Sequence, residues 1–201
     1  MKPITPPRAT QRLGRFLSFC GKPIVVSAPC LAAVSCLATP RWPDRLRWWC
    51  LATAAISVTP FVHVRYGVRS GRLSDHEVSV RRERFWPYAG EIGAALLSYG
   101  VMRALGAPRE MTALVLAVAG AMVAVTGVTL LWKVSMHATG TAGAVTVLVL
   151  LYGRRLLPLA VIVPLVGWSR CALGRHTPAQ VVAGAAIGVA APVLVFRAMG
   201  L

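Results

Sequence analysis

The chain alternates long apolar runs with short polar or basic segments. Several of the runs reach the roughly 17–25 residues that cross a hydrocarbon core. A segment isolated in lipid must satisfy its own backbone hydrogen bonds, so each run predicts a helix. Seven such runs lie at about 23–39, 49–64, 88–105, 112–132, 138–152, 156–168 and 178–196. The pattern predicts an all-α protein, a polytopic membrane bundle of about six to seven transmembrane helices.

Composition agrees with a membrane protein. Charged residues make up 14% of the chain, whereas a soluble domain carries about a quarter. Alanine and glycine are frequent in the fourth, fifth and seventh runs, and small residues let helices approach closely in lipid. We therefore expect a basic N-terminal arm at 1–22, disordered or interfacial, followed by a single transmembrane domain at 23–201.

The chain is strongly basic, with 22 Lys and Arg against six acids and a net charge of +16. In a soluble protein this would favour a nucleic-acid partner. Here the basic residues lie mainly in short loops, where they mark cytoplasmic segments, contacts with anionic lipid or phosphate sites. We expect membrane lipids as partners and no nucleic acid. The five cysteines have no metal-ligand spacing, and no metal or cofactor is expected.

Seven crossings place the arm, the loop at 65–87 and the turns at 133–137 and 169–176 on one face of the membrane. These segments hold most of the polar chemistry. They also hold most of the Lys and Arg, which favours the cytoplasmic side for this face. The expected location is the cell membrane, with a multi-pass topology and a site at its cytoplasmic face.

Two histidines on this face, His137 and His176, each stand at the start of a helix. Helix N-termini direct N–H groups and partial positive charge toward anions, and nearby arginines add planar donors for phosphate. Taken singly, each residue has a structural alternative such as a cap or a lipid-facing basic loop. The segments lack the paired aspartates that hold Mg²⁺ in prenyl transferases. The histidines, the helix N-termini and the arginines together therefore indicate a metal-free pocket for a dianionic group.

The residues around these histidines resemble a known family. Ser169, Arg170 and His176 form S-R-x5-H, which is similar to the third signature of the type 2 phosphatidic acid phosphatase (PAP2) superfamily. Gln180 stands where that signature has an aspartate. The residues at 134–137 keep the serine and histidine of the second signature, usually P-S-G-H.

The first signature, a lysine, six residues and then Arg-Pro, matches poorly. Arg81, Arg82 and Arg84 supply arginines, but Glu77 stands seven residues before Arg84 and Phe85 follows it. The resemblance extends over about residues 65–196, and the order of the three blocks agrees with the family.

The resemblance implies a metal-independent phosphatase acting on a lipid phosphate or diphosphate, such as an isoprenoid phosphate or phosphatidic acid. It implies His176 as the nucleophile that forms a phosphohistidine, and His137 as general acid and then base. Lys133 has no counterpart in the family pattern. The resemblance assigns the phosphate oxygens to Arg170, Ser135, the backbone N–H of Met136, and Arg81 or Arg84.

The glutamine at position 180 allows two interpretations, an active phosphatase and a catalytically lapsed protein. The Gln180 amide oxygen can accept the N–H of His176 and orient the ring, although without the full charge of a carboxylate. The alternative is a catalytically lapsed PAP2-like protein that binds anionic lipid or a protein partner. A small transporter is a third reading, favoured by the helix count alone. The sequence leaves the lipid and the oligomeric state open.

Overall fold

The computed structural model describes residues 8–201, and all regular structure in this range is helical. The all-α prediction is confirmed. The α-helices are α1 (Arg8–Cys20), α2 (Pro23–Ala38), α3 (Trp42–Thr53), α4 (Thr59–Arg69), α5 (Phe85–Ala104), α6 (Arg109–Leu131), α7 (Met136–Tyr152), α8 (Ile162–Ala172) and α9 (Pro178–Ala198). Three shorter pieces are the π-helix η1 (Ala54–Val58) and the 3₁₀-helices η2 (Arg81–Arg84) and η3 (Arg154–Val161).

All seven predicted apolar runs are helical, but the second is interrupted. Pro60 has no N–H, and its ring crowds the carbonyl of the residue four positions earlier. The chain adapts by widening into η1, where the backbone N–H of Thr59 bonds to the carbonyl of Ala54. π-Helical segments occur mostly as single turns of this kind inside longer α-helices.

Fewer helices meet the length and apolarity needed to cross a membrane than the six to seven predicted. Within residues 8–201 three do so alone: Arg109–Leu131, Arg154–Ala172 and Pro178–Ala198. The pair Ala9–Cys20 and Pro23–Ala38, bent by 43°, would make a fourth. The difference arises partly because α7, with 17 residues, is short.

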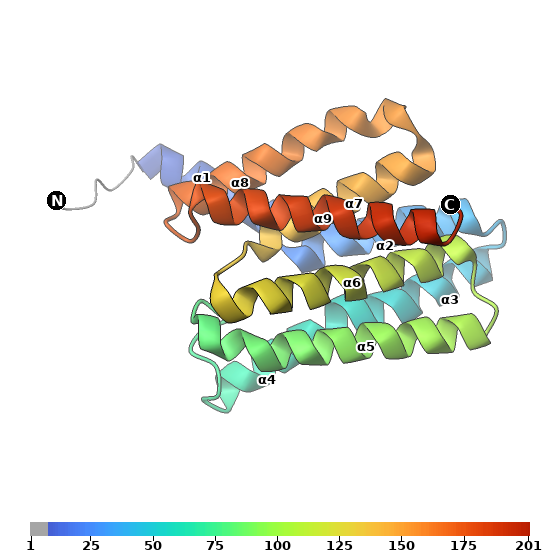
Figure 1. Ribbon diagram of the computed structural model, residues 1–201, viewed down its shortest axis with the longest axis horizontal. Coiled ribbons are helices and arrows are strands. Elements are labelled where there is room, and N and C mark those ends of the chain that lie inside the picture. Colours follow the sequence, from blue (N-terminus) through green and yellow to red (C-terminus); the bar gives the residue numbers. More distant parts are fainter. Residues whose placement is uncertain (1–7) are drawn as a thin grey trace.

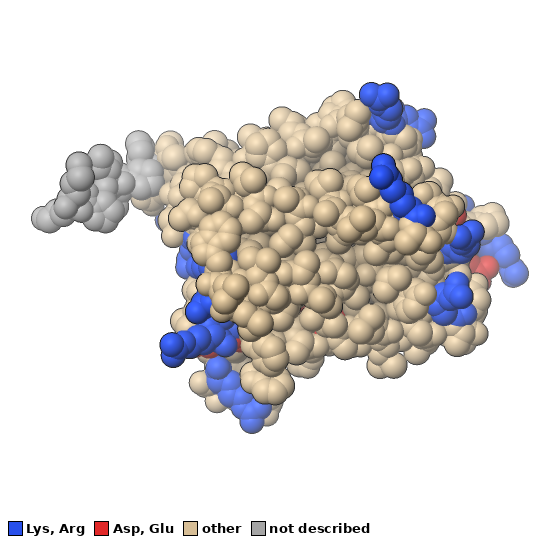
Figure 2. All heavy atoms as spheres, viewed as in Figure 1, with Lys and Arg blue, Asp and Glu red and all other residues tan. Residues whose placement is uncertain are grey.

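The helices run side by side along the long axis, so their connections gather at two ends (Figure 1). One end carries α1, the loop between α4 and α5, and the starts of α7 and α9. The opposite end carries the C-terminus and the turn between α5 and α6. On the visible face, Lys and Arg gather toward these ends and leave an uncharged middle (Figure 2). This is the charge distribution of a membrane protein.

Helices α7 and α9 approach each other through glycines. A Cβ on Gly184 would lie 2.6 Å from the backbone oxygen of Ser135, and one on Gly188 would lie 2.3 Å from that of Thr139. Only hydrogen fits at either position. The close approach sets the first turn of α7 beside the first turn of α9.

The N-terminal arm, predicted to be disordered or interfacial, is helical over the part that is described. Its residues from Arg8 to Cys20 form helix α1 rather than a disordered segment, and α1 packs along α8. A Cβ on Gly21 would lie 2.4 Å from the Val166 side chain, which again shows close packing. Residues 1–7 of the arm lie outside the described residues.

Candidate functional site

The best-defined contact of the site joins His176 to the start of α9. Gln180 Oε1 lies 3.1 Å from His176 Nδ1 and accepts the backbone N–H of Thr177 at 3.2 Å. Because a backbone N–H can only donate, the atom facing it is the amide oxygen rather than the nitrogen. Nδ1 of His176 therefore carries the proton, and Nε2 carries the free lone pair.

Gln180 also has a structural role as a helix-capping residue. The Thr177 side chain accepts the backbone N–H of Gln180, so the two residues form a capping box at the start of α9. The sequence signal for this was available, since Thr-x-x-Gln before an apolar run is the capping-box pattern. The cap fixes the Gln180 side chain, and the fixed side chain orients the His176 ring.

The surroundings of His176 keep its ring neutral. The side chain is buried, and burial followed by the charge of Lys133 lowers its pKa to about 4. The hydrogen bond with Gln180 opposes this shift but does not outweigh it. At neutral pH the Nε2 lone pair is therefore available to an electrophile.

His137 is buried in the first turn of α7, and no described residue bonds to its Nε2. Arg170, Glu77 and His176 lie close enough to act on it electrostatically. The residue before this turn, Ser135, donates its backbone N–H to the carbonyl of Gln180 at 3.3 Å. The starts of α7 and α9 thus hold the two histidines together.

Arg170, in the last turn of α8, is 3% exposed. Its Nη1 donates to Ser18 Oγ on α1, and its Nη2 lies 2.9 Å from Glu77 Oε2. Its Nε has no bonding partner in the described part of the chain. Neither Ser18 nor Glu77 was predicted to belong to the site, although Glu77 stands where the first signature has its lysine.

The structure separates the two arginines that the sequence offered for the first signature. Arg84 is buried, with Nε donating to the Val78 carbonyl at 2.8 Å and Nη1 to the Val134 carbonyl at 3.1 Å. It thereby joins the loop before α5 to the segment leading into α7. Arg81 is exposed and donates to the Thr129 carbonyl at the end of α6. Arg84 is close enough to act electrostatically on His176, whereas Arg81 is held at the end of α6.

Lys133 and Arg175 complete the charged surroundings. Lys133 Nζ donates to the backbone oxygen of Arg175 at 3.1 Å, and its charge acts directly on His176. The Arg175 side chain is half exposed and reaches Glu77 Oε2 at 3.8 Å. Five cationic side chains and one carboxylate among the described residues thus lie around the histidines: Lys22, Arg84, Arg170, Arg175, Lys133 and Glu77.

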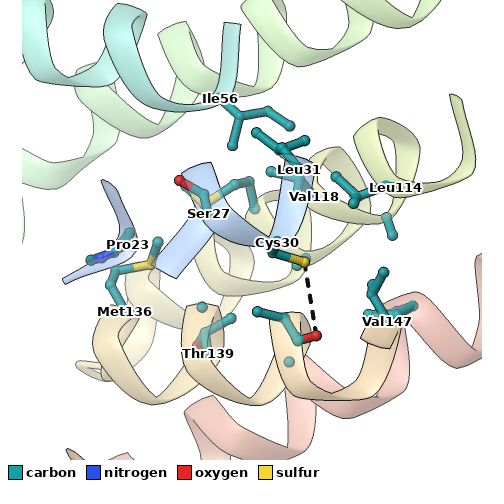
Figure 3. A pocket seen from close by; sticks show the side chains of 18 of the residues that line it. Pro23, Ser27, Cys30, Leu31, Ile56, Leu114, Val118, Met136, Thr139 and Val147 are labelled. Atoms are coloured by element: carbon teal, nitrogen blue, oxygen red, sulfur yellow. Dashed lines mark hydrogen bonds between the residues drawn. The ribbon is translucent and has the colours of Figure 1, made fainter. Parts of the chain in front are cut away.

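An apolar pocket lies between α2, α6 and α7, with α9 at its edge, and contains about 740 Å³ of empty space that is partly open to the outside. Pro23 and Cys30 of α2 face Met136 and Val147 of α7 across it (Figure 3). Met136 is the neighbour of His137, so the pocket begins beside the histidine site. Glu91 is the only charged residue among the described residues that line the pocket.

Within the described range, no group of three or more His, Cys, Asp or Glu side chains is arranged to hold a metal ion. The family model of the PAP2 superfamily matches residues 82–200, more than half of the chain. The chain belongs to the PAP2 superfamily. The predicted family is thereby confirmed, and with it a phosphatase-type fold. The matched region of this PAP2 protein includes Arg84 and both histidines but begins after Glu77. No curated protein and no solved structure matches the chain.

Proposed function

We propose that this PAP2 protein is a multi-pass membrane phosphatase that removes phosphate from a lipid phosphate or diphosphate through a phosphohistidine intermediate. The observation that carries the proposal is the state of His176. Its ring is buried and neutral, its Nδ1–H is held by Gln180, and its Nε2 is free beside a cluster of cations. A neutral imidazole with one nitrogen available is the form that acts as a nucleophile.

In the first step, Nε2 of His176 attacks phosphorus. As the P–N bond forms, the bond from phosphorus to the leaving oxygen breaks, and His137 donates a proton to that oxygen. The Gln180 amide oxygen accepts from Nδ1 throughout and stabilises the positive charge that develops on the ring. In the second step, His137 takes a proton from water, the water oxygen attacks phosphorus, and the P–N bond breaks to release inorganic phosphate.

The phosphoryl oxygens require donors that are in place before the reaction. Arg170, Arg84 and Lys133 supply positive charge around the two histidines. The hydroxyl of Ser135 accepts the backbone N–H of Ala138 as a helix cap, which leaves its own hydrogen free to donate. The backbone N–H of Met136, at the start of α7, adds the donor expected at a helix N-terminus.

The substrate class follows from the position of the site. The phosphate would lie at one charged end of the bundle, while the apolar pocket beside Met136 would receive part of a lipid chain. An isoprenoid phosphate or phosphatidic acid has this construction. The excess of Lys and Arg in the segments around the site favours its placement at the cytoplasmic face.

The decisive experiment measures phosphate release by the full chain in detergent, from a panel of lipid phosphates and diphosphates, with EDTA present. The wild-type protein should turn over at least one of them. His176→Ala should be inactive, and His137→Ala should lose about 10²–10⁴-fold in rate, the usual contribution of a general acid. His76→Ala is the matched control, because His76 is exposed on the neighbouring loop and should leave the rate unchanged.

A second candidate function is a non-catalytic protein that binds anionic lipid. Two observations favour it: Gln180 lacks the charge of an aspartate, and Glu77 already pairs with Arg170. No release from any substrate, combined with binding to anionic vesicles that Arg170→Gln abolishes, would support this alternative. Acid-labile ³²P on the wild-type chain that disappears in His176→Ala would exclude it.

A further inference from the structure

The phosphate site already contains an anion of its own. Arg170 is anchored on one side by the bond from Nη1 to Ser18 on α1. Its opposite edge presents Nε and Nη2, the two parallel N–H groups that bind a phosphate in bidentate fashion. Glu77 Oε2 accepts from Nη2 at 2.9 Å, while Nε, the other donor of this edge, is buried and has no partner among residues 8–201.

Glu77 is charged in this position. Burial raises the pKa of its carboxyl group, but the hydrogen bond and the charge of Arg170 outweigh burial and hold the pKa below its usual range. A negative carboxylate and a phosphate dianion on the same guanidinium edge would repel each other. Bidentate binding of a phosphate to Nε and Nη2 of Arg170 therefore favours departure of Glu77 from Nη2.

The Glu77 side chain has room to move away from Arg170. Its side chain is 33% exposed, on the loop between α4 and α5, whereas Arg170 is buried. Arg175 Nε lies 3.8 Å from the same carboxylate oxygen, and the Arg175 side chain is itself half exposed. A small movement toward solvent would release Arg170 and keep the ion pair with Arg175.

From these contacts we propose that Glu77 is the internal counter-anion of the phosphate site, and that phosphate displaces its carboxylate from the Nε–Nη2 edge of Arg170 while Glu77 stays with Arg175. This rests on the proposed function and adds a residue that tunes it. When the site is empty, Glu77 keeps a buried guanidinium paired, since an unpaired buried charge is costly. When hydrolysis is complete, it competes with inorganic phosphate and promotes product release.

The test measures the binding of inorganic phosphate to the full chain in detergent by calorimetry. Glu77→Gln keeps an acceptor for Nη2 but removes the charge that phosphate must displace. It should bind phosphate about tenfold more tightly, the effect of losing one charged hydrogen-bond competitor. Glu83→Gln is the matched control. It removes the same charge from the same loop, where Glu83 accepts the backbone N–H of Ser74 at 2.8 Å, and should change the affinity less than twofold.

Unchanged or weaker phosphate binding by Glu77→Gln would overturn the proposal, and so would an equal gain in Glu83→Gln. If Glu77→Gln does not fold, Glu77→Asp takes its place. The shorter carboxylate keeps the charge but withdraws from Arg170, so it should bind phosphate more tightly than the wild type, and failure to do so would overturn the proposal.

The binding measurement requires no turnover, so the two proposals fail separately. Tighter phosphate binding in Glu77→Gln without hydrolysis of any lipid phosphate would remove the proposed function and leave the exchange at Arg170. Hydrolysis by the wild type with an unchanged phosphate affinity in Glu77→Gln would support the proposed function and overturn the exchange at Arg170. In an active enzyme, Glu77→Gln should also show stronger inhibition by inorganic phosphate.

Discussion

The amide oxygen of Gln180 lies 3.1 Å from His176 Nδ1 and also accepts the backbone N–H of Thr177. One side chain therefore closes the cap of α9 and sets the tautomer of the histidine. A carboxylate at this position would do both and add a negative charge. Because the amide is uncharged, burial and the charge of Lys133 control the ring, and its pKa falls to about 4.

Gln180→Glu should shift the pH dependence of kcat/KM. Glutamate is also a capping-box residue, so the geometry is kept. Its charge stabilises the protonated ring and raises the pKa of His176 from about 4 toward its ordinary value. Since the neutral ring is the nucleophile, the acidic limb of the profile should move to higher pH, with activity retained near pH 8.

The matching controls at this position are Gln180→Asp and Gln180→Leu. The aspartate variant should be active, whereas the leucine variant, which leaves Nδ1–H without an acceptor, should lose activity at every pH. A folded but inactive Gln180→Asp protein would show that the role given to Gln180 is wrong.

Lys133→Gln should weaken the phosphate site although the family pattern has no place for this lysine. The side chain adds positive charge beside His176 and Arg84. Its removal should raise KM for a lipid phosphate by about five- to tenfold, the usual loss for one charged contact. Arg82→Gln, an exposed cation on the nearby loop, is the control and should leave KM unchanged. Equal effects of both changes would mean that Lys133 acts only through the general field.

Gly188→Ala should destabilise the bundle and reduce activity. The added Cβ would lie 2.3 Å from the backbone oxygen of Thr139, so α7 and α9 must move apart. Overpacking of this kind costs about 1–3 kcal/mol, and the separation also moves His137 away from His176. Gly120→Ala on α6 meets nothing within 4 Å and should be neutral or slightly stabilising. Thermal unfolding and phosphate release measure the two effects.

Ala121→Phe should impair turnover of a lipid phosphate but not of a small soluble phosphate ester such as p-nitrophenyl phosphate. Ala121 lines the apolar pocket, and a phenyl ring there would fill space assigned to the lipid chain. Val123→Phe, two residues along α6 and exposed, is the matched control. A parallel loss on both substrates would indicate a folding defect, and no loss on either would exclude the pocket as the chain site.

The sequence alone determined the features that depend on spacing along the chain. Apolar runs specified the helices, and the S-R-x5-H pattern indicated the family that the match to residues 82–200 confirms. The contact between His176 and Gln180 also followed from the sequence. His176 immediately precedes the N-cap Thr177, and the capping box turns the Gln180 side chain back toward the residues before the helix. For the second run, in contrast, the helix was predicted but its π-helical turn η1 was not.

Tertiary packing decided the rest of the site. Ser18 and Glu77 meet Arg170 across separations of 152 and 93 residues, and no local pattern encodes such contacts. The choice of Arg84 over Arg81 likewise depends on carbonyl groups of Val78 and Val134 that only the folded loops bring together. The physical reason is that local hydrogen bonds follow from the turn geometry of one helix. A buried guanidinium instead takes its partners from whichever helices pack around it.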